Sequence, residues 1–316
     1  MNTPLVSIII STYNRAHLIG ETLDSVLAQS YTHWECIVVD DGSTDTTQKL
    51  IVKYCEKDSR FQYHQRPKDR LKGANACRNY GFELCQGDYV QWFDSDDILH
   101  QHLLEYKIEA FESTNLDGVI SKTKMFQNNI SNICGKENRT KLTKNTLEDF
   151  LQQKLMWYLP DVLWKRDFLA GKKLFDEQLL AGQDRDFHAR MLLKKPSLKI
   201  LDRYLVYYRK HENSITKKIN NTRNERLRRS HLVSLAKLIK LLKNENLLSY
   251  NLRIFFHGNV IKYLPAVFKS REHTILQMRL LATLSFFNLN IIVNWIKFCI
   301  AFISLKLFGK GERLLK

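Results

Sequence analysis

"PLVSIIISTYNRAHLIGETLDSVLAQSYTHWECIVVDDGS", residues 4–43, contains two apolar runs joined by an amphipathic segment. Residues 4–12 form a short run rich in β-branched side chains, which is typical of a buried strand. Apolar side chains then recur at helical spacing through residues 16–30, and residues 34–43 return to a strand that ends in an acidic loop. This order predicts a strand, a helix and a second strand of an α/β fold.

The same alternation continues toward residue 97. We expect a helix over 45–58, a strand in "RFQYHQ" (60–65), a helix over 74–86 and a strand in "GDYVQWF" (87–93). Strands separated by helices predict a mostly parallel sheet covered on both faces, with ligands bound at the carboxyl ends of the strands. Acidic residues follow two of these strands: Asp40 and Asp41 after one, and Asp94, Asp96 and Asp97 after the other.

The segment "DSDD", residues 94–97, places three carboxylates within four residues. These groups repel one another unless a cation lies between them, so the segment predicts a metal site. The alternative is a helix start, because acidic and hydroxyl side chains before an apolar run also make a good N-cap.

Composition limits the class of protein. A chain of 316 residues with 44% hydrophobic content can bury a sizeable core, as one large domain with an appendage or as two domains. Its six cysteines form no zinc-binding or disulfide-scaffold pattern, and "MNTPLVSIII" does not resemble a signal peptide. We therefore expect reduced thiols and a cytoplasmic location.

The net charge of +16 is concentrated in the last third of the chain. Residues 203–316 contain 22 Lys and Arg against 5 Asp and Glu, whereas residues 1–202 contain 27 against 28. A basic segment of this kind attracts a polyanion, which is either nucleic acid or an anionic membrane surface. Because no interleaving of aromatic and basic residues or known binding motif accompanies the charge, we do not expect nucleic acid.

An apolar stretch lies near the C-terminus. Between Leu280 and Leu305 the only charged residue is Lys297. Its polar residues Thr283, Asn290, Asn294, Lys297 and Ser304 fall on one stripe of a helix. This pattern favours a helix at the membrane surface over one that spans it. A buried helical subdomain or an oligomer contact is the alternative.

Four strings occur in the order expected of one family: "VSIIISTYNR", "VVDDGSTD", "GANACRNYGFELCQGDYVQWFDSDD" and "GQDRDFHARML". In residues 4–215 the chain resembles glycosyltransferase family 2, whose members have the GT-A fold. The resemblance implies a nucleotide-sugar glycosyltransferase domain over residues 1–215. Residues 216–316 are then a basic helical region that we expect to dock on a membrane surface.

The resemblance also implies a role for the acidic cluster. Transfer from a nucleotide diphosphate sugar leaves a diphosphate with about three negative charges, which a divalent cation neutralises. Asp96 would hold Mn²⁺ or Mg²⁺, and Asp94 would help to hold the ribose or the diphosphate. Asp97 would make supporting hydrogen bonds or cap a helix.

The resemblance places the nucleotide at the first two strand ends. Asp41 would accept a hydrogen bond from the base, which favours uracil and hence a UDP-sugar. Ser11 and Tyr13 would line the base and ribose, and Asp40 would support the loop. Arg78 would contact phosphate or brace the acidic cluster, with an exposed helical salt bridge as the alternative.

The acceptor side carries the expected base. In the family the segment matching "GQDRD" usually reads Glu-Asp, so the general base of an inverting displacement maps to Asp184, while Gln183 departs from the pattern. Asp186 is the alternative carboxylate. His211 would close over the diphosphate or the metal, or be an ordinary surface histidine. Residues 124–145 are polar and are expected to form a loop or an excursion on the acceptor side.

The sequence therefore predicts a metal-dependent hexosyl- or N-acetylhexosaminyl-transferase. We expect it to extend a lipid-linked glycan in surface polysaccharide biosynthesis, bound peripherally at the inner face of the cell membrane. Two alternatives are a nucleotidyltransferase with a similar acidic metal site and a non-enzymatic protein that binds polyanions through the basic tail. The first has no need of Asp184 and usually has a Gly-rich basic loop, which is absent near the start of this sequence.

Overall fold

The computed structural model describes residues 3–112, 115–139, 141–211, 225–262 and 279–284, together with residues 293, 296–297 and 300. The chain divides into two compact units. One comprises residues 1–178 and 183–212, and the other comprises residues 179–182 and 213–316.

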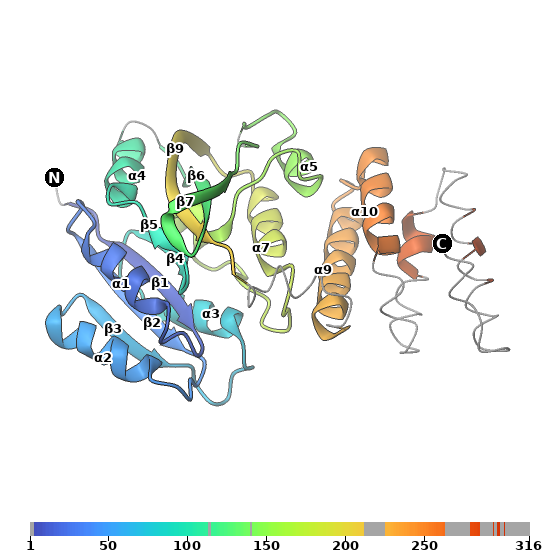
Figure 1. Ribbon diagram of the computed structural model, residues 1–316. Coiled ribbons are helices and arrows are strands. Elements are labelled where there is room, and N and C mark those ends of the chain that lie inside the picture. The colour runs from blue at the N-terminus through green and yellow to red at the C-terminus, as the bar shows by residue number, and fades with distance from the viewer. Residues whose placement is uncertain are drawn as a thin grey trace. The chain divides into compact units, whose positions relative to one another are not determined.

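The first unit is built on four parallel strands, β1 (Val6–Thr12), β2 (Trp34–Asp40), β3 (Phe61–Gln65) and β4 (Tyr89–Asp94), in the order β3-β2-β1-β4 (Figure 1). Every residue of β1 and β2 is buried, which explains their nearly continuous apolar sequence. The four strands predicted from the sequence are confirmed.

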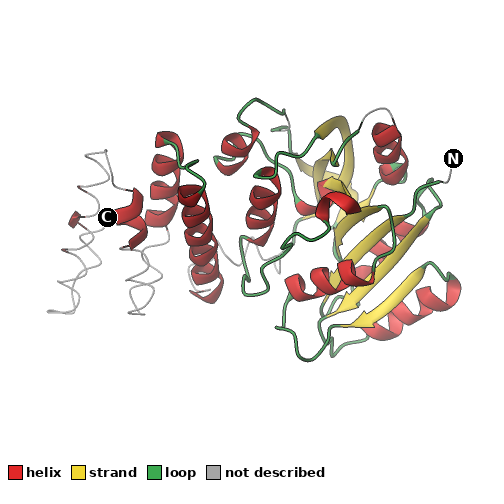
Figure 2. Cartoon of the chain, turned by 180° about the vertical axis from the view of Figure 1, so that it is seen from behind, coloured by secondary structure: helices red, strands yellow, loops and turns green. Residues whose placement is uncertain are grey.

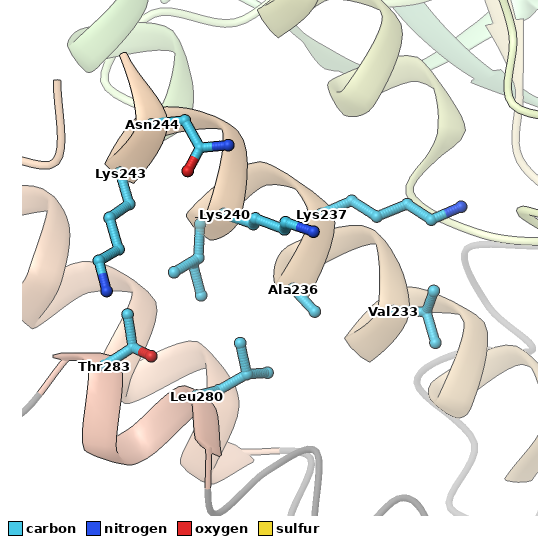
Figure 3. Close-up of a pocket in the computed structure, with 9 residues that line it drawn as sticks. Val233, Ala236, Lys237, Lys240, Lys243, Asn244, Leu280 and Thr283 are labelled. Carbon is cyan, nitrogen blue, oxygen red and sulfur yellow. The ribbon is translucent and has the colours of Figure 1, made fainter. Parts of the chain in front are cut away.

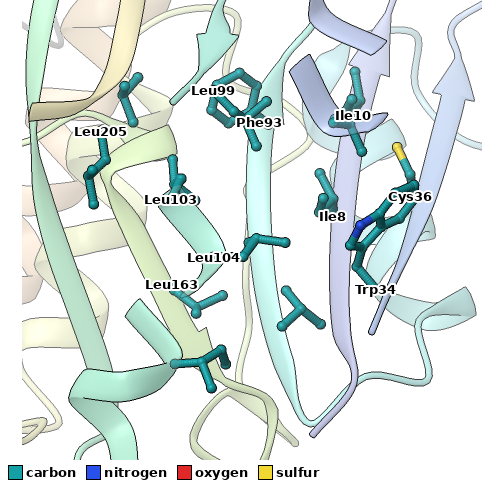
Figure 4. Close-up of a cluster of buried hydrophobic side chains, with 14 of the residues drawn as sticks. Ile8, Ile10, Trp34, Cys36, Phe93, Leu99, Leu103, Leu104, Leu163 and Leu205 are labelled. Atoms are coloured by element: carbon teal, nitrogen blue, oxygen red, sulfur yellow. The ribbon is translucent and has the colours of Figure 1, made fainter. Parts of the chain in front are cut away.

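Helices cover both faces of this sheet (Figure 2). Apolar side chains from α1 (Ile19–Leu27), α2 (Thr47–Lys57) and α4 (Leu103–Glu112) pack with Ile8 and Ile10 on one face, in the cluster shown in Figure 4. On the other face, Ile9 packs with α3 (Ala74–Leu84) and α7 (Gln183–Leu192). The alternation of Ile8, Ile9 and Ile10 follows from the two-residue period of a strand.

The second half of the sheet is mixed. β8 (Val162–Lys165) pairs antiparallel with β4 and with β6 (Gly118–Gln127), and β6 pairs parallel with β9 (Leu198–Arg209). β5 (Ile98–Leu99) and β7 (Asn129–Lys136) add antiparallel to β9 and β6. The remaining short helices are α5 (Thr146–Leu151), a 3₁₀ turn at Leu159–Asp161 and α6 (Arg166–Leu169). Of the two alternatives for 124–145, a loop or an excursion, the loop was wrong in part, because β6 and β7 form a hairpin there.

The register of the parallel strands places four polar residues at one edge. Ser11 of β1 pairs with Asp94 of β4, and Thr12 pairs with Asp40 of β2. Because parallel strands end at the same edge, the acidic loops after β2 and β4 start on either side of the end of β1, which lies between these two strands. The sheet therefore gathers these loops at its carboxyl edge.

The second unit contains α9 (Glu225–Asn244), α10 (Tyr250–Lys262) and a helical segment over residues 279–284. Residues 179–182 join it through Ser230, whose Oγ accepts hydrogen bonds from the backbone N–H groups of Leu180 (2.7 Å) and Ala181 (3.2 Å). A pocket of about 510 Å³ beside α9 has a lining of apolar groups and lysines (Figure 3). Its lining residues are Val233, Ala236, Lys237, Ile239, Lys240, Lys243, Asn244, Leu280 and Thr283.

No helix within the described ranges combines the length and the apolar character needed to cross a bilayer. Of the polar stripe predicted for the C-terminal segment, Asn290, Asn294 and Ser304 lie outside the described residues. The surface helix, and the assignment of residues 1–215 and 216–316 to transfer and docking, stay predictions.

Candidate active site

Arg78 connects two of the candidate carboxylates. It projects from α3 and is only 5% exposed, so the alternative of an exposed helical salt bridge was wrong. Its Nη2 donates to Oδ1 of Asp94 over 2.8 Å, and its Nη1 lies 3.9 Å from Oδ1 of Asp184. Burial raises the pKa of Asp94, and the Arg78 charge opposes that shift. Arg78 thus braces the acidic cluster and holds Asp94 and Asp184 on either side of one guanidinium group.

Asp96 lies among cationic and hydrogen-bonding partners. The Nε2 atom of His211 is 3.1 Å from Oδ2 of Asp96, and Nε of Arg15 is 3.5 Å from the same oxygen. Burial acts to raise the pKa of Asp96, but the hydrogen bond from His211 and the charge of Arg15 outweigh it and hold the pKa below its ordinary value. The structure therefore brings the predicted His211 to an ionised Asp96.

Asp97 is 1% exposed and forms hydrogen bonds with neighbouring residues. Its Oδ1 accepts from the Arg209 backbone N–H over 2.9 Å, and its carbonyl oxygen accepts from Oγ1 of Thr22 over 2.8 Å. Burial, with the nearby charges of Asp96 and Asp94, raises the pKa of Asp97 well above its ordinary value. Of the two predicted roles, the structure shows supporting hydrogen bonds; strand β5 follows directly, so helix capping was wrong.

Sequence reasoning missed two arginines at this site. Nε of Arg209 donates to the carbonyl oxygen of Asp96 over 2.9 Å, and its Nη2 donates to Glu21 over 2.9 Å. Arg15 follows β1 in the string "STYNR" and reaches Asp96 as described above. The sequence signal that could have identified Arg209 was its position, two residues before the predicted site residue His211 and at the end of β9.

The loop after β2 is held by Asp40. Its Oδ1 accepts from the backbone N–H and the hydroxyl of Ser43, at 2.9 and 2.6 Å, and its Oδ2 accepts from the Tyr63 hydroxyl at 2.9 Å. Gly42 has φ +85°, a left-handed conformation that favours glycine. Asp40 and Gly42 therefore shape the loop.

Asp41 lies on the same loop, 7% exposed. Its Oδ1 accepts from Nε of Arg66 at 2.5 Å and from the backbone N–H of Gly73 at 3.1 Å. Ser11 is buried at the end of β1, whereas Tyr13 is exposed and Nζ of Lys72 lies 4.2 Å from its ring centroid. These residues stand at the carboxyl edge of the sheet, and their contact with a base or ribose stays a prediction.

Asp184 stands at the start of α7, with one oxygen facing inward. Its side chain is 41% exposed overall, but Oδ1 is buried and makes no hydrogen bond within the described part of the chain. Burial raises the pKa of Asp184 to about 6; the Asp94 charge acts in the same direction and Arg78 acts against it. A carboxylate with this pKa is suited to accept a proton near neutral pH.

Asp186, the alternative carboxylate, has a different environment. It is buried, and its Oδ2 accepts from Nε and Nη2 of Arg190 at 2.9 and 2.7 Å, one turn along α7. Because this pairing holds Asp186 to its own helix, Asp184 is the better placed of the two to act as a base.

Asp96 and His211 are the candidate ligands of a divalent cation. No group of three or more His, Cys, Asp or Glu side chains in the described ranges is arranged to hold a metal ion alone. Asp96 and His211 nevertheless place a carboxylate and an imidazole 3.1 Å apart. Mg²⁺ usually binds through one or two carboxylates plus substrate phosphates, and imidazole and carboxylate are both ligands of first-row metals. The residues therefore fit a cation whose coordination a diphosphate completes.

Comparison with known proteins identifies relatives over most of the first unit. The family model described as Glycosyl transferase family 2 matches residues 7–167. The chain is 29% identical over 225 residues to the uncharacterized glycosyltransferase EpsJ of Bacillus subtilis, an alignment that covers 67% of this chain. It covers 63% of EpsJ, so the chain spans less than two thirds of that relative's length.

A second relative and a solved structure extend the comparison. The chain is 34% identical over 136 residues to the E. coli UDP-Glc:alpha-D-GlcNAc-diphosphoundecaprenol beta-1,3-glucosyltransferase WfgD, covering 43% of this chain and 51% of WfgD. The structure of S. aureus TarS 1–349 in complex with UDP-GlcNAc superposes with a TM-score of 0.59 at 18% identity. That superposition covers 96% of this chain and 92% of the other, and it shows a shared fold.

Proposed function

The chain belongs to glycosyltransferase family 2 and has the GT-A fold, and from this premise we propose that it transfers a sugar, with inversion, from a UDP-sugar to a lipid-linked glycan. The observation that carries the proposal is the pair of carboxylates on Arg78. Asp94 lies 2.8 Å and Asp184 lies 3.9 Å from its guanidinium nitrogens, so a donor-side and an acceptor-side group meet at one residue.

The donor would bind at the carboxyl edge of the sheet. Asp41, with Ser11 and Tyr13, would hold the uridine, and Asp94 would hold the ribose or the diphosphate. The TarS structure, which has the same fold, contains UDP-GlcNAc, and this supports a uridine nucleotide without identifying the sugar. Asp41 already accepts two hydrogen bonds through Oδ1, which fix its carboxylate for a third through Oδ2.

Asp96 and His211 would hold Mn²⁺ or Mg²⁺. When bound, such a cation neutralises the charge that develops on the leaving diphosphate. Arg15 and Arg209 keep the Asp96 loop in place, through its carboxylate and its carbonyl oxygen respectively. These two arginines are positioning residues in this proposal.

Asp184 would remove the proton of the acceptor hydroxyl as its oxygen attacks the anomeric carbon. Attack from the face opposite the diphosphate inverts the configuration at that carbon. Arg78 orients Asp184 and keeps its pKa from rising further, since burial alone would favour the protonated form. Asp184 would thus act on the face of the sugar opposite the diphosphate, whose charge a cation held by Asp96 and His211 would neutralise.

The pH dependence of transfer should report Asp184. A base whose pKa is raised to about 6 is active when deprotonated, so transfer rate should fall as the pH drops through about 6 and level off above it. Initial rates measured from pH 5 to 8 at saturating donor and metal test this. A rate that is constant across this range would exclude Asp184 as the base.

The acceptor would be a glycan carried on a membrane lipid. The name of WfgD specifies an acceptor linked to diphosphoundecaprenol, which supports this class of acceptor for a chain of the same family. In the second unit, Lys237, Lys240 and Lys243 line the pocket beside α9 together with apolar side chains. Lysines next to apolar surface are suited to an anionic bilayer, so we extend the proposal to peripheral docking through this unit.

Vesicle flotation tests this docking. The full chain should bind vesicles that contain phosphatidylglycerol and should not bind vesicles of neutral lipid. Replacing Lys237, Lys240 and Lys243 together by Gln should weaken binding roughly tenfold or more, because each lysine near an anionic surface contributes about 1 kcal/mol. The matched control replaces three exposed lysines of α2 by Gln: Lys49, Lys53 and Lys57. Equal losses in both variants would show that only net charge matters and would contradict docking through α9.

A further inference from the structure

Three lysines surround one tyrosine on the second half of the sheet. The Nζ atoms of Lys122, Lys124 and Lys136 lie 5.7, 5.5 and 5.7 Å from the ring centroid of Tyr204. The sheet register brings them there: Lys124 of β6 pairs with Lys136 of β7, and Lys122 pairs with Tyr204 of β9. These strands run side by side in Figure 1. We call Lys122, Lys124, Lys136 and Tyr204 the lysine cluster.

The lysine cluster has more positive charge than its neighbours balance. Lys122 bonds to Oδ1 of Asp202 at 2.5 Å, but Asp202 is 89% exposed. Over the ranges that the structure describes, Lys122 alone of the three lysines forms an ion pair. Attraction to the ring face offsets part of the repulsion, and the Tyr204 hydroxyl, which donates to Asn138, fixes that ring. A compact anion between the ammonium groups would offset the rest.

The lysine cluster lies near the candidate active site along β9. Lys124 pairs with Tyr207, two residues before Arg209, and Tyr204 lies five residues before Arg209. At about 3.3 Å per residue these positions are roughly 7 and 17 Å along the strand from the residue that holds the Asp96 loop. The lysine cluster, through Tyr204, and the residue that holds the Asp96 loop therefore share one strand, β9.

We propose that the lysine cluster binds a phosphate group of the acceptor. This proposal rests on the proposed function, and it identifies the acceptor as a phosphorylated glycan whose phosphate lies close to the sugar that is extended. Ammonium groups are point donors that suit phosphate oxygens from several directions. The side chain of Lys122 is only 16% exposed, so a single inserted group reaches it more readily than a flat bilayer surface does.

Calorimetric titration of the full chain tests the proposal. The chain is first saturated with UDP and Mn²⁺, which fills the donor site, and is then titrated with N-acetylglucosamine 1-phosphate or with uncharged N-acetylglucosamine. The sugar phosphate should bind more tightly than the neutral sugar. Replacing both Lys124 and Lys136 by Gln should weaken its binding roughly tenfold or more, because two charge-assisted contacts are lost. Affinity for UDP should not change.

Two controls make the outcomes separable. The Lys53→Gln, Lys57→Gln variant removes the same charge from exposed positions of α2 and should bind the sugar phosphate like the native chain. If the double variant does not fold, Lys136→Gln alone, at an exposed position, takes its place. It should weaken binding of the sugar phosphate by a smaller factor. Equal binding of the sugar phosphate by the native chain and these cluster variants would overturn the proposal. Cluster variants that bind the sugar phosphate normally but bind phosphatidylglycerol vesicles more weakly than the native chain would also overturn it, and they would indicate a membrane contact. Failure to bind UDP would count against the proposed function instead.

Discussion

Asp184→Asn should lower the rate of sugar transfer at least a hundredfold, the lower end of the range of about 10²–10⁴ expected for a lost general base. Asparagine keeps the size of the side chain but cannot accept the acceptor proton. Arg78 retains its 2.8 Å contact with Asp94, so the donor side of the site should stay in place. Affinity for UDP in the presence of Mn²⁺, measured by calorimetry, should therefore change little.

Asp186→Asn is the matched control for Asp184→Asn. It makes the same chemical change two residues along α7, in a side chain that pairs with Arg190. Its effect should fall mainly on stability, so thermal unfolding is measured for both variants and transfer is compared where both are folded. If Asp186→Asn abolishes transfer in the folded state and Asp184→Asn does not, Asp186 is the base.

Asp96→Asn should remove metal-dependent transfer, and chelation of divalent cations should do the same to the native chain. The reason is the charge on the leaving diphosphate, whose stabilisation by a bound cation contributes several kcal/mol. Activity of the native chain should return when Mn²⁺ is added in excess of the chelator, whereas the variant should not recover at the same Mn²⁺ concentration. Initial rates across a Mn²⁺ titration measure both effects.

The control for Asp96→Asn is Asp69→Asn, which neutralises an exposed carboxylate in the loop after β3. It should respond to chelator and Mn²⁺ like the native chain. Full activity of the native chain in chelator would rule out the metal site, and so would an Asp96→Asn variant with an unchanged Mn²⁺ titration.

The first half of the fold could be predicted from the sequence because its signals are local. β1 and β2 are nearly continuous apolar runs, and α1 shows apolar side chains at helical spacing. The β6–β7 hairpin lacked such a signal. β7 is almost wholly exposed, and β6 carries lysines between its buried residues. β6 pairs with β9, which lies about 80 residues further along the chain, as in the pair Gly118 and Leu198. No local sequence pattern reveals such a pairing.

The candidate site also contains residues that could be predicted from the sequence and residues that could not. Asp94, Asp96 and Asp184 stand in recognisable strings, and the structure places Asp94 and Asp184 against one arginine. Arg209 was missed because its contact with the Asp96 carbonyl spans 113 residues, and in sequence it is one of many basic residues in the last third. Positioning residues of this kind become visible only when the chain is folded.

The most direct test of Asp184-dependent transfer from a UDP-sugar follows release of nucleoside diphosphate. The full chain is incubated with Mn²⁺, a lipid extract that contains lipid-linked glycans, and each member of a panel of UDP- and GDP-sugars. We expect release of UDP from at least one UDP-sugar, slowed about a hundredfold or more by Asp184→Asn. Release at the native rate by that variant, or release from GDP-sugars alone, would contradict transfer from a UDP-sugar with Asp184 as the base.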